Sequence, residues 1–143
     1  MENFLTPVLA LILWTFVMWL WMYKRRIPAM MAMTKDIQDF IENPKMKDDI
    51  PAKARWAADN YNHLHEQPVI FYALMFYLYL TKLTPEWLLY MAWAYVAIRI
   101  VHSLVQVTTN KVKARCSLFA LGSVVLIIMG GYAAFHLVSG GAA

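Results

Sequence analysis

Two sets of polar and ionisable residues recur at helical spacing in this otherwise hydrophobic sequence. Their members are, in chain order, Arg55, Asp59, Asn62 and Glu66, then Arg99, His102, Gln106 and Asn110. On a helix turning about 100° per residue, the first set spans an arc of roughly 60° and the second roughly 80°. A face of cations, carboxylates and amides can hold a charged small molecule, carry a proton or fix helix packing through ion pairs.

Glu66 and Arg99 are the two residues that we expect to meet. Each charge alone is costly in lipid, whereas a hydrogen-bonded ion pair offsets most of that cost. Such a pair can serve a ligand site, or it can simply fix the register of two helices. His63 points away from the first face, so we expect it at the interface or against a neighbouring helix. We expect Cys116 to be a small packed residue.

Several other chemistries lack their sequence signals. No Cys/His cluster has zinc-ligand spacing, and there is no Gly-rich phosphate loop or Gly-x-Ser-x-Gly nucleophile elbow. The single cysteine excludes an intramolecular disulfide framework. The sequence therefore predicts no metal site. The net charge of +4 concerns membrane orientation and anionic lipid, and we expect no nucleic-acid partner.

The elements that position these residues are membrane helices. Hydrophobic residues make up 61% of the 143-residue chain and charged residues 15%, against about 25% charged in soluble domains. One small globular core cannot bury so much apolar surface, which predicts an integral membrane protein. We expect an all-α membrane protein, a bundle of four transmembrane helices in one domain (1–143). The predicted spans are residues 4–23, 62–82, 87–107 and 116–138.

The second span is unusual because its apolar part is short. Only Val69 to Leu80 is uninterrupted, whereas a hydrocarbon core needs about 20 residues. We therefore expect one helix from about Pro51 to Lys82, bent at Pro68, with its polar half entering the membrane. Asn62 and Glu66 then face protein or a hydrated pocket.

The distribution of basic residues predicts the topology. Eleven of them lie on or next to the connections 24–54 and 108–115, and the opposite side holds only Lys82. Cytoplasmic loops of membrane proteins are enriched in Lys and Arg. We expect both connections to be cytoplasmic and both termini to lie outside.

Three segments resemble a known family. They read N-Y-N-H-L-H-E-Q-P-V-I-F-Y (60–72), R-I-V-H-S-L (99–104) and N-K-V-K-A-R (110–115). With four spans in so short a chain, they resemble the MAPEG family, the membrane-associated proteins in eicosanoid and glutathione metabolism, and its bacterial branch in particular. The resemblance implies a homotrimer, in a bacterial inner membrane, that binds glutathione between subunits and takes a lipophilic substrate from the lipid.

The resemblance also implies roles for individual residues. It assigns thiolate stabilisation, the catalytic role, to Arg115. It assigns glutathione binding to five residues, namely Arg55, Asn62, Glu66, Arg99 and His102. The residue types suit this ligand, because arginines pair with its two carboxylates and a glutamate with its ammonium group. Asn62 and Glu66 are four residues apart, where well-studied members have a spacing of three.

Three functions are compatible with these patterns. The first is a glutathione-dependent transferase or peroxidase acting on lipophilic electrophiles. The second is a small oligomeric transporter with Glu66 as its proton-coupling site. The third is a non-catalytic membrane protein in which both polar faces only set helix packing.

Overall fold

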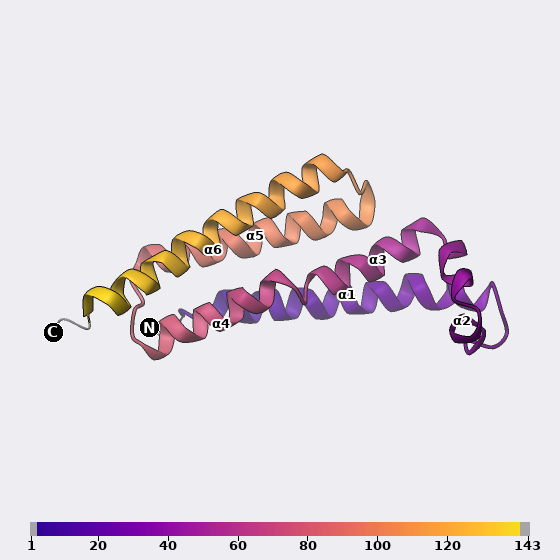
Figure 1. Ribbon diagram of the computed structural model, residues 1–143, viewed down its shortest axis with the longest axis horizontal. Coiled ribbons are helices and arrows are strands. Elements are labelled where there is room, and N and C mark those ends of the chain that lie inside the picture. Colours follow the sequence, from indigo (N-terminus) through magenta and orange to yellow (C-terminus); the bar gives the residue numbers. More distant parts are fainter. Residues whose placement is uncertain (1–2, 141–143) are drawn as a thin grey trace.

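The computed structural model describes residues 3–140, and every regular element in that range is helical. In chain order the elements are α1 (Thr6–Met31), α2 (Asp39–Glu42), the 3₁₀-helix η1 (Pro44–Asp49), α3 (Ala52–His63), α4 (Gln67–Leu80), α5 (Glu86–Thr108) and α6 (Val112–Gly140). Figure 1 shows α3 and α4 returning along α1, and α5 and α6 forming a second hairpin. The α5–α6 turn, α2 and η1 lie toward one end of the bundle, and the α4–α5 turn lies toward the other (Figure 1).

Three helices are long and apolar enough to cross a membrane, namely α1, α5 and α6. They confirm the prediction of an all-α membrane protein. The fourth predicted span rests on α4, whose 14 residues rise only about 21 Å, short of a hydrocarbon core of about 30 Å. The four-helix count therefore stays a prediction that depends on how much of α3 enters the membrane.

The prediction of one continuous helix from Pro51 to Lys82 is wrong. Residues 64–66 separate α3 from α4, and Glu66 has φ −96° and ψ −98°, outside the helical region. Pro68 explains the break, because it has no N–H to donate to the carbonyl of Leu64 and its ring crowds that carbonyl. The same proline suits the first turn of the new helix, where it stands in α4. The expected bend is thus an interruption just before Pro68.

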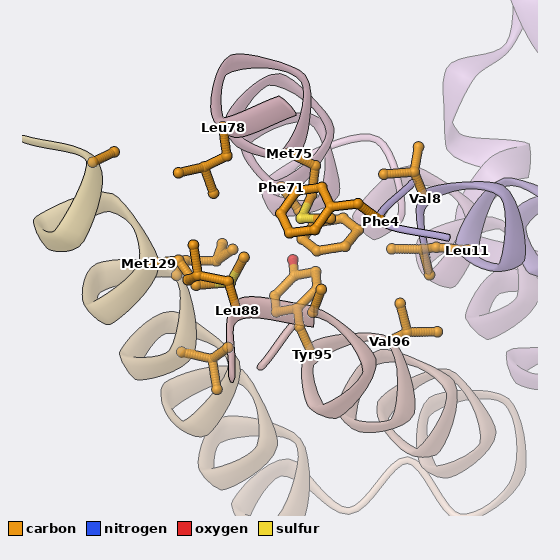
Figure 2. Packing of buried hydrophobic residues seen from close by; sticks show 14 of the residues in the cluster. Phe4, Val8, Leu11, Phe71, Met75, Leu78, Leu88, Tyr95, Val96 and Met129 are labelled. Carbon is orange, nitrogen blue, oxygen red and sulfur yellow. The ribbon is translucent and has the colours of Figure 1, made fainter. Parts of the chain in front are cut away.

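The buried core joins α1, α4, α5 and α6. At its centre Phe71 of α4 stacks on Tyr95 of α5, with ring centroids 4.6 Å apart and both side chains fully buried (Figure 2). Leu11 of α1 and Met129 of α6 close the two sides of this cluster. The outer faces carry large exposed apolar side chains such as Leu20 and Ile127, as expected of a surface that faces lipid.

A second, smaller core fixes the long connection between α1 and α3. Phe40 of α2 is buried with Ile50 and Ala54, and Met30 and Met33 pack against them. This cluster holds η1 and the start of α3 near the end of α1. It thereby positions the basic residues that line the second of the two pockets described below.

Candidate functional site

Arg99 lies at the centre of a buried polar network. Its side chain is 2% exposed, Nε donates a hydrogen bond to the hydroxyl of Tyr95 at 3.0 Å, and Nη2 donates to the side-chain carbonyl of Gln67. Gln67 in turn donates from Nε2 to the hydroxyl of Ser123 at 2.7 Å. The rings of Tyr95 and Phe119 lie 5.3 and 5.4 Å from the guanidinium carbon. The network ties α4, α5 and α6 together with neutral partners.

The predicted ion pair between Glu66 and Arg99 is wrong within the subunit. The side chain of Glu66 is 61% exposed, and its Oε2 lies 3.1 Å from Nδ1 of His63. Glu66 falls in the break between α3 and α4, whereas Gln67 opens α4 and turns toward Arg99. Within residues 3–140, the one close contact between a basic and an acidic side chain is that of His63 with Glu66, which is an ion pair only when the imidazole is protonated.

Arg115 lies at the centre of a second polar cluster, in the first turns of α6. Its Nη1 donates a hydrogen bond to Oδ1 of Asn110 at 2.6 Å, and its Nη2 lies 3.4 Å from Nε2 of His63. Asn110 lies in the turn two residues after the end of α5 and has φ 49°, a left-handed conformation that asparagine tolerates better than most residues. The cluster therefore joins the end of α3, the α5–α6 turn and the start of α6.

His63 bridges Arg115 and Glu66. If Nε2 accepts from Arg115, the ring proton lies on Nδ1 and faces the carboxylate of Glu66, so one neutral tautomer suits both neighbours. Nδ1 of His63 and the carboxylate of Glu66 are close enough for a hydrogen bond, but the two groups are not aligned to form one. The contact is therefore electrostatic. His63 lies at the end of α3 because the helix is interrupted immediately after it.

An amphipathic pocket of about 350 Å³ opens beside Arg115. Its lining consists of His63, His102, Val112, Arg115, Cys116 and Phe119. Polar groups of α3, α5 and α6 form one part of the wall, and apolar side chains of α6 form the rest. The volume falls in the range of small-molecule sites, and no carboxylate is among these described lining residues. We call this the Arg115 pocket.

His102 contributes an almost completely buried imidazole to the Arg115 pocket. It is 4% exposed, and its ring centroid lies 6.0 Å from that of His63 in an edge-on arrangement. Among residues 3–140, no side chain or backbone group hydrogen-bonds to its ring nitrogens. Nε of Arg115 is likewise buried without a hydrogen-bond partner in this part of the chain. That Nε is shielded from solvent, so the pocket presents the His102 imidazole as the polar group that a ligand can satisfy.

A second pocket, of about 330 Å³, lies beside η1 and the start of α3, and we call it the basic pocket. Its lining consists of Arg26, Lys47, Ile50, Arg55, Trp56, Ala58, Asp59 and Asn110. Three cations against one carboxylate favour an anionic group there. Asn110 lines this basic pocket and also accepts the hydrogen bond from Arg115, so it lies between the two pockets.

The predicted site residues divide between these locations. Arg115 and His102 line the Arg115 pocket, and Arg55 lines the basic pocket, where its Nη1 donates to the carbonyl of Asp48 at 3.2 Å. Arg99 is buried behind Phe119, a wall residue of the Arg115 pocket. Asn62 and Glu66 are exposed and line neither pocket in this subunit.

Sequence reasoning missed the roles of Gln67 and Cys116. Gln67 replaces Glu66 as the partner of Arg99. His63, expected at the interface or against a neighbouring helix, contacts Arg115 of α6. Cys116 was expected to be packed, which is wrong, because its side chain is exposed and lines the Arg115 pocket. The available signal was Pro68. A proline disrupts a helix at the residue four positions earlier, and α3 accordingly ends at His63 and α4 begins at Gln67.

Fold and pockets together define an integral membrane protein with a small polar site toward one end of a helical bundle. The MAPEG family model matches residues 4–135, which is most of the chain. The chain therefore belongs to the MAPEG family, and the resemblance seen in the sequence is confirmed. No curated protein and no solved structure gives a significant match.

Proposed function

We propose that this protein is a membrane-bound, glutathione-dependent transferase or peroxidase that acts on lipophilic electrophiles. Membership in a glutathione-related membrane family supports the general class. The single observation that carries the proposal is the setting of Arg115, a guanidinium in an amphipathic pocket without a carboxylate in its lining. That setting suits an anionic sulfur and an apolar co-substrate.

Arg115 is the residue to which we assign stabilisation of the glutathione thiolate. The thiolate is the nucleophile of thiol chemistry, and a neighbouring cation increases its population. Asn110 and His63 hold the two terminal nitrogens of the guanidinium, so its orientation is set before a ligand arrives. Each terminal nitrogen carries a second N–H that can donate to the thiolate, because a guanidinium has five donors in all.

The basic pocket is suited to the carboxylates of glutathione. Arg26, Lys47 and Arg55 line it, and guanidinium groups bind carboxylates through paired hydrogen bonds. Asn110 lies between this pocket and Arg115, which allows one elongated ligand to use both. In this arrangement the acidic ends of glutathione occupy the basic pocket and its sulfur reaches Arg115.

The exposed residues Asn62 and Glu66 support a site completed by a neighbouring subunit. Polar side chains within a membrane are costly when they face lipid, so they normally face protein or water. A homotrimer would cover both residues, and Glu66 would then pair with the ammonium group of glutathione. The same proposal puts the connections 24–54 and 108–115 on the cytoplasmic side of a bacterial inner membrane.

A binding experiment with a matched charge control tests the proposal. Detergent-solubilised wild-type protein should bind glutathione and show thiolate absorbance near neutral pH. Arg115→Gln should keep much of the binding and lose most of the thiolate signal, because the carboxylate contacts lie elsewhere. Lys113→Gln removes an exposed cation two residues away and should change neither. A well-folded oligomer with neither binding nor thiolate would refute the proposal.

A further inference from the structure

Cys116 lies where a dissolved reagent can meet the Arg115 pocket. It is the only cysteine of the sequence, and its exposed side chain lines the pocket together with Arg115 and Phe119. α6 starts at Val112, so Cys116 is about 6 Å along the axis from that start, near a basic turn. This depth is close to the membrane–water interface, where polar molecules have access.

The buried imidazole of His102 independently indicates a ligand at the same place. The residue is more than nine-tenths buried and lines the pocket, and no hydrogen bond to its ring is found within residues 3–140. Its nitrogens are not among the fully enclosed unpaired atoms, so their remaining exposure is toward the pocket. A buried polar group normally finds a partner, and an unbonded one in a pocket wall indicates a ligand or water that completes it. The thiol and the unsatisfied ring therefore share one cavity.

The charge of the pocket selects the kind of reagent. Arg115 lines it, the guanidinium of Arg99 lies behind the ring of Phe119, and no described lining residue is acidic. Anionic molecules are therefore favoured over neutral ones of similar size. The cations of the basic pocket also favour an anionic reagent, because this pocket shares Asn110 with the Arg115 cluster.

We infer that Cys116 is a thiol–disulfide exchange site that reacts selectively with acidic disulfides, glutathione disulfide above all. The inferred product is a mixed disulfide whose glutathionyl group lies in the Arg115 pocket. The thiol, the cationic lining and the unbonded His102 ring supply the nucleophile, the charge selection and a polar contact for the attached group.

The reaction needs no reagent beyond the disulfide itself. Cys116 loses its proton to water, and its sulfur attacks one sulfur of glutathione disulfide. The bond between the two glutathione sulfurs breaks as the new bond to Cys116 forms. One glutathione leaves as a thiolate and takes up a proton from water. Cys116 is oxidised, half of the disulfide is reduced, and an added thiol reverses the exchange.

The mixed disulfide would regulate the site described above, a consequence that rests on the proposed function. A glutathionyl group attached to Cys116 occupies the Arg115 pocket and excludes free glutathione from it. Enzymatic turnover would then fall when the glutathione pool becomes oxidised and recover on reduction. The exchange itself depends only on the pocket and its thiol.

Intact-mass spectrometry of the detergent-purified full chain tests the inference. On incubation with glutathione disulfide we expect one glutathionyl group per chain, removed by dithiothreitol and absent in Cys116→Ser. For each thiol, the rate with glutathione disulfide is divided by the rate with the neutral 2-hydroxyethyl disulfide. This ratio should be about tenfold larger for Cys116 than for N-acetylcysteine amide, a small thiol without a pocket, since a charge-assisted contact contributes a factor of that size. S-methylglutathione, which cannot exchange, should slow the reaction by competing for the pocket.

Two variants separate pocket selection from simple exposure. Arg115→Gln should slow exchange with glutathione disulfide by about tenfold and leave the neutral disulfide unaffected. Lys113→Gln removes a nearby exposed cation and should leave both rates close to wild type. If Arg115→Gln does not fold, the competition by S-methylglutathione on the wild-type protein still decides the question.

The outcomes distinguish this inference from the proposed function. Absence of the adduct overturns the inference, as does an adduct that forms without selectivity and without competition. A protein that binds glutathione as a thiolate but forms no adduct keeps its proposed function. A protein that forms the adduct selectively but never binds free glutathione keeps the exchange site and loses the proposed function.

Discussion

Gln67 and Arg99 are joined by a hydrogen bond from the guanidinium Nη2 to the side-chain carbonyl of the amide. The amide nitrogen of Gln67 donates to Ser123, so one neutral side chain connects α5 to α6 through α4. Because these partners are neutral, the buried guanidinium of Arg99 is satisfied by hydrogen bonds and not by an acidic side chain. The aromatic faces of Tyr95 and Phe119 provide the remaining electrostatic stabilisation.

Replacing Gln67 should destabilise the bundle. In Gln67→Leu the guanidinium of Arg99 and the hydroxyl of Ser123 both lose a partner, which costs roughly 2–3 kcal/mol for a buried charged group. Unfolding of the purified protein in a denaturing detergent series measures this change. The same substitution at the exposed Gln38 should alter stability by less than about 0.5 kcal/mol. Equal stability of the two variants would contradict the structural role of Gln67.

Replacing Glu66 should affect ligand binding and leave folding unchanged. Its side chain is mostly exposed, and within residues 3–140 its one contact with a basic side chain is with His63, so Glu66→Gln should change the unfolding free energy by less than about 1 kcal/mol. Glutathione affinity should fall by about tenfold if the carboxylate pairs with the ammonium group. Calorimetric titration measures the affinity. Substrate-driven proton movement in proteoliposomes that Glu66→Gln abolishes would instead favour the transporter hypothesis.

Replacing Asn110 should disturb the orientation of Arg115. Asn110→Gly removes the acceptor at 2.6 Å from Nη1 and keeps the left-handed backbone available, since glycine adopts φ near 49° without strain. In this variant the thiol of bound glutathione should ionise at a higher pH than in the wild-type protein, because a less well oriented guanidinium stabilises the thiolate less. A pH titration of the thiolate absorbance measures this change. Lys82→Gly is the matched control, because Lys82 has φ 59° in the α4–α5 turn, far from both pockets. An unchanged titration in Asn110→Gly would count against this role.

Restoring a backbone donor at position 68 should weaken the site. Pro68→Ala provides an N–H for the carbonyl of Leu64, so the helix can continue through residues 64–66. His63 would then move relative to Arg115, and glutathione affinity should fall, because binding groups act only when well positioned. Pro28→Ala is the control, since Pro28 lies inside α1 without interrupting it. Unchanged affinity in Pro68→Ala would show that tertiary packing alone maintains the break.

The helical membrane class followed from the sequence because hydrophobic run length and charge content are local properties. The runs that became α1, α5 and α6 each exceed the thickness of a hydrocarbon core, whatever their neighbours are. The face containing Arg99 and His102 was also predictable, since α5 is uninterrupted from Glu86 to Thr108. A helical projection is valid along such a helix, and both residues are buried on one side.

The partners of those residues could not be predicted in the same way. A projection from Arg55 to Glu66 assumes an unbroken helix, and the interruption at residues 64–66 invalidates it for Glu66. Gln67 and His63 gained their roles from that interruption. Pro68 signals the interruption, but no pattern of residue types indicates which partner each of the two residues contacts. The exposure of Cys116 depends on how α6 lies against α3 and α5. Such packing is a tertiary property that a single sequence does not specify.

The interruption between α3 and α4 also determines where a helix dipole ends. The peptide dipoles of a helix place about half a negative charge at its C-terminus. Because α3 stops at His63, that negative end lies beside the guanidinium of Arg115, whose Nη2 is 3.4 Å from the His63 ring. An unbroken helix would carry the same fractional charge to the opposite side of the membrane. Pro68 thus places the negative end of α3 and the positive end of α4 within four residues of each other, partway along the hairpin, where an unbroken helix would have neither end.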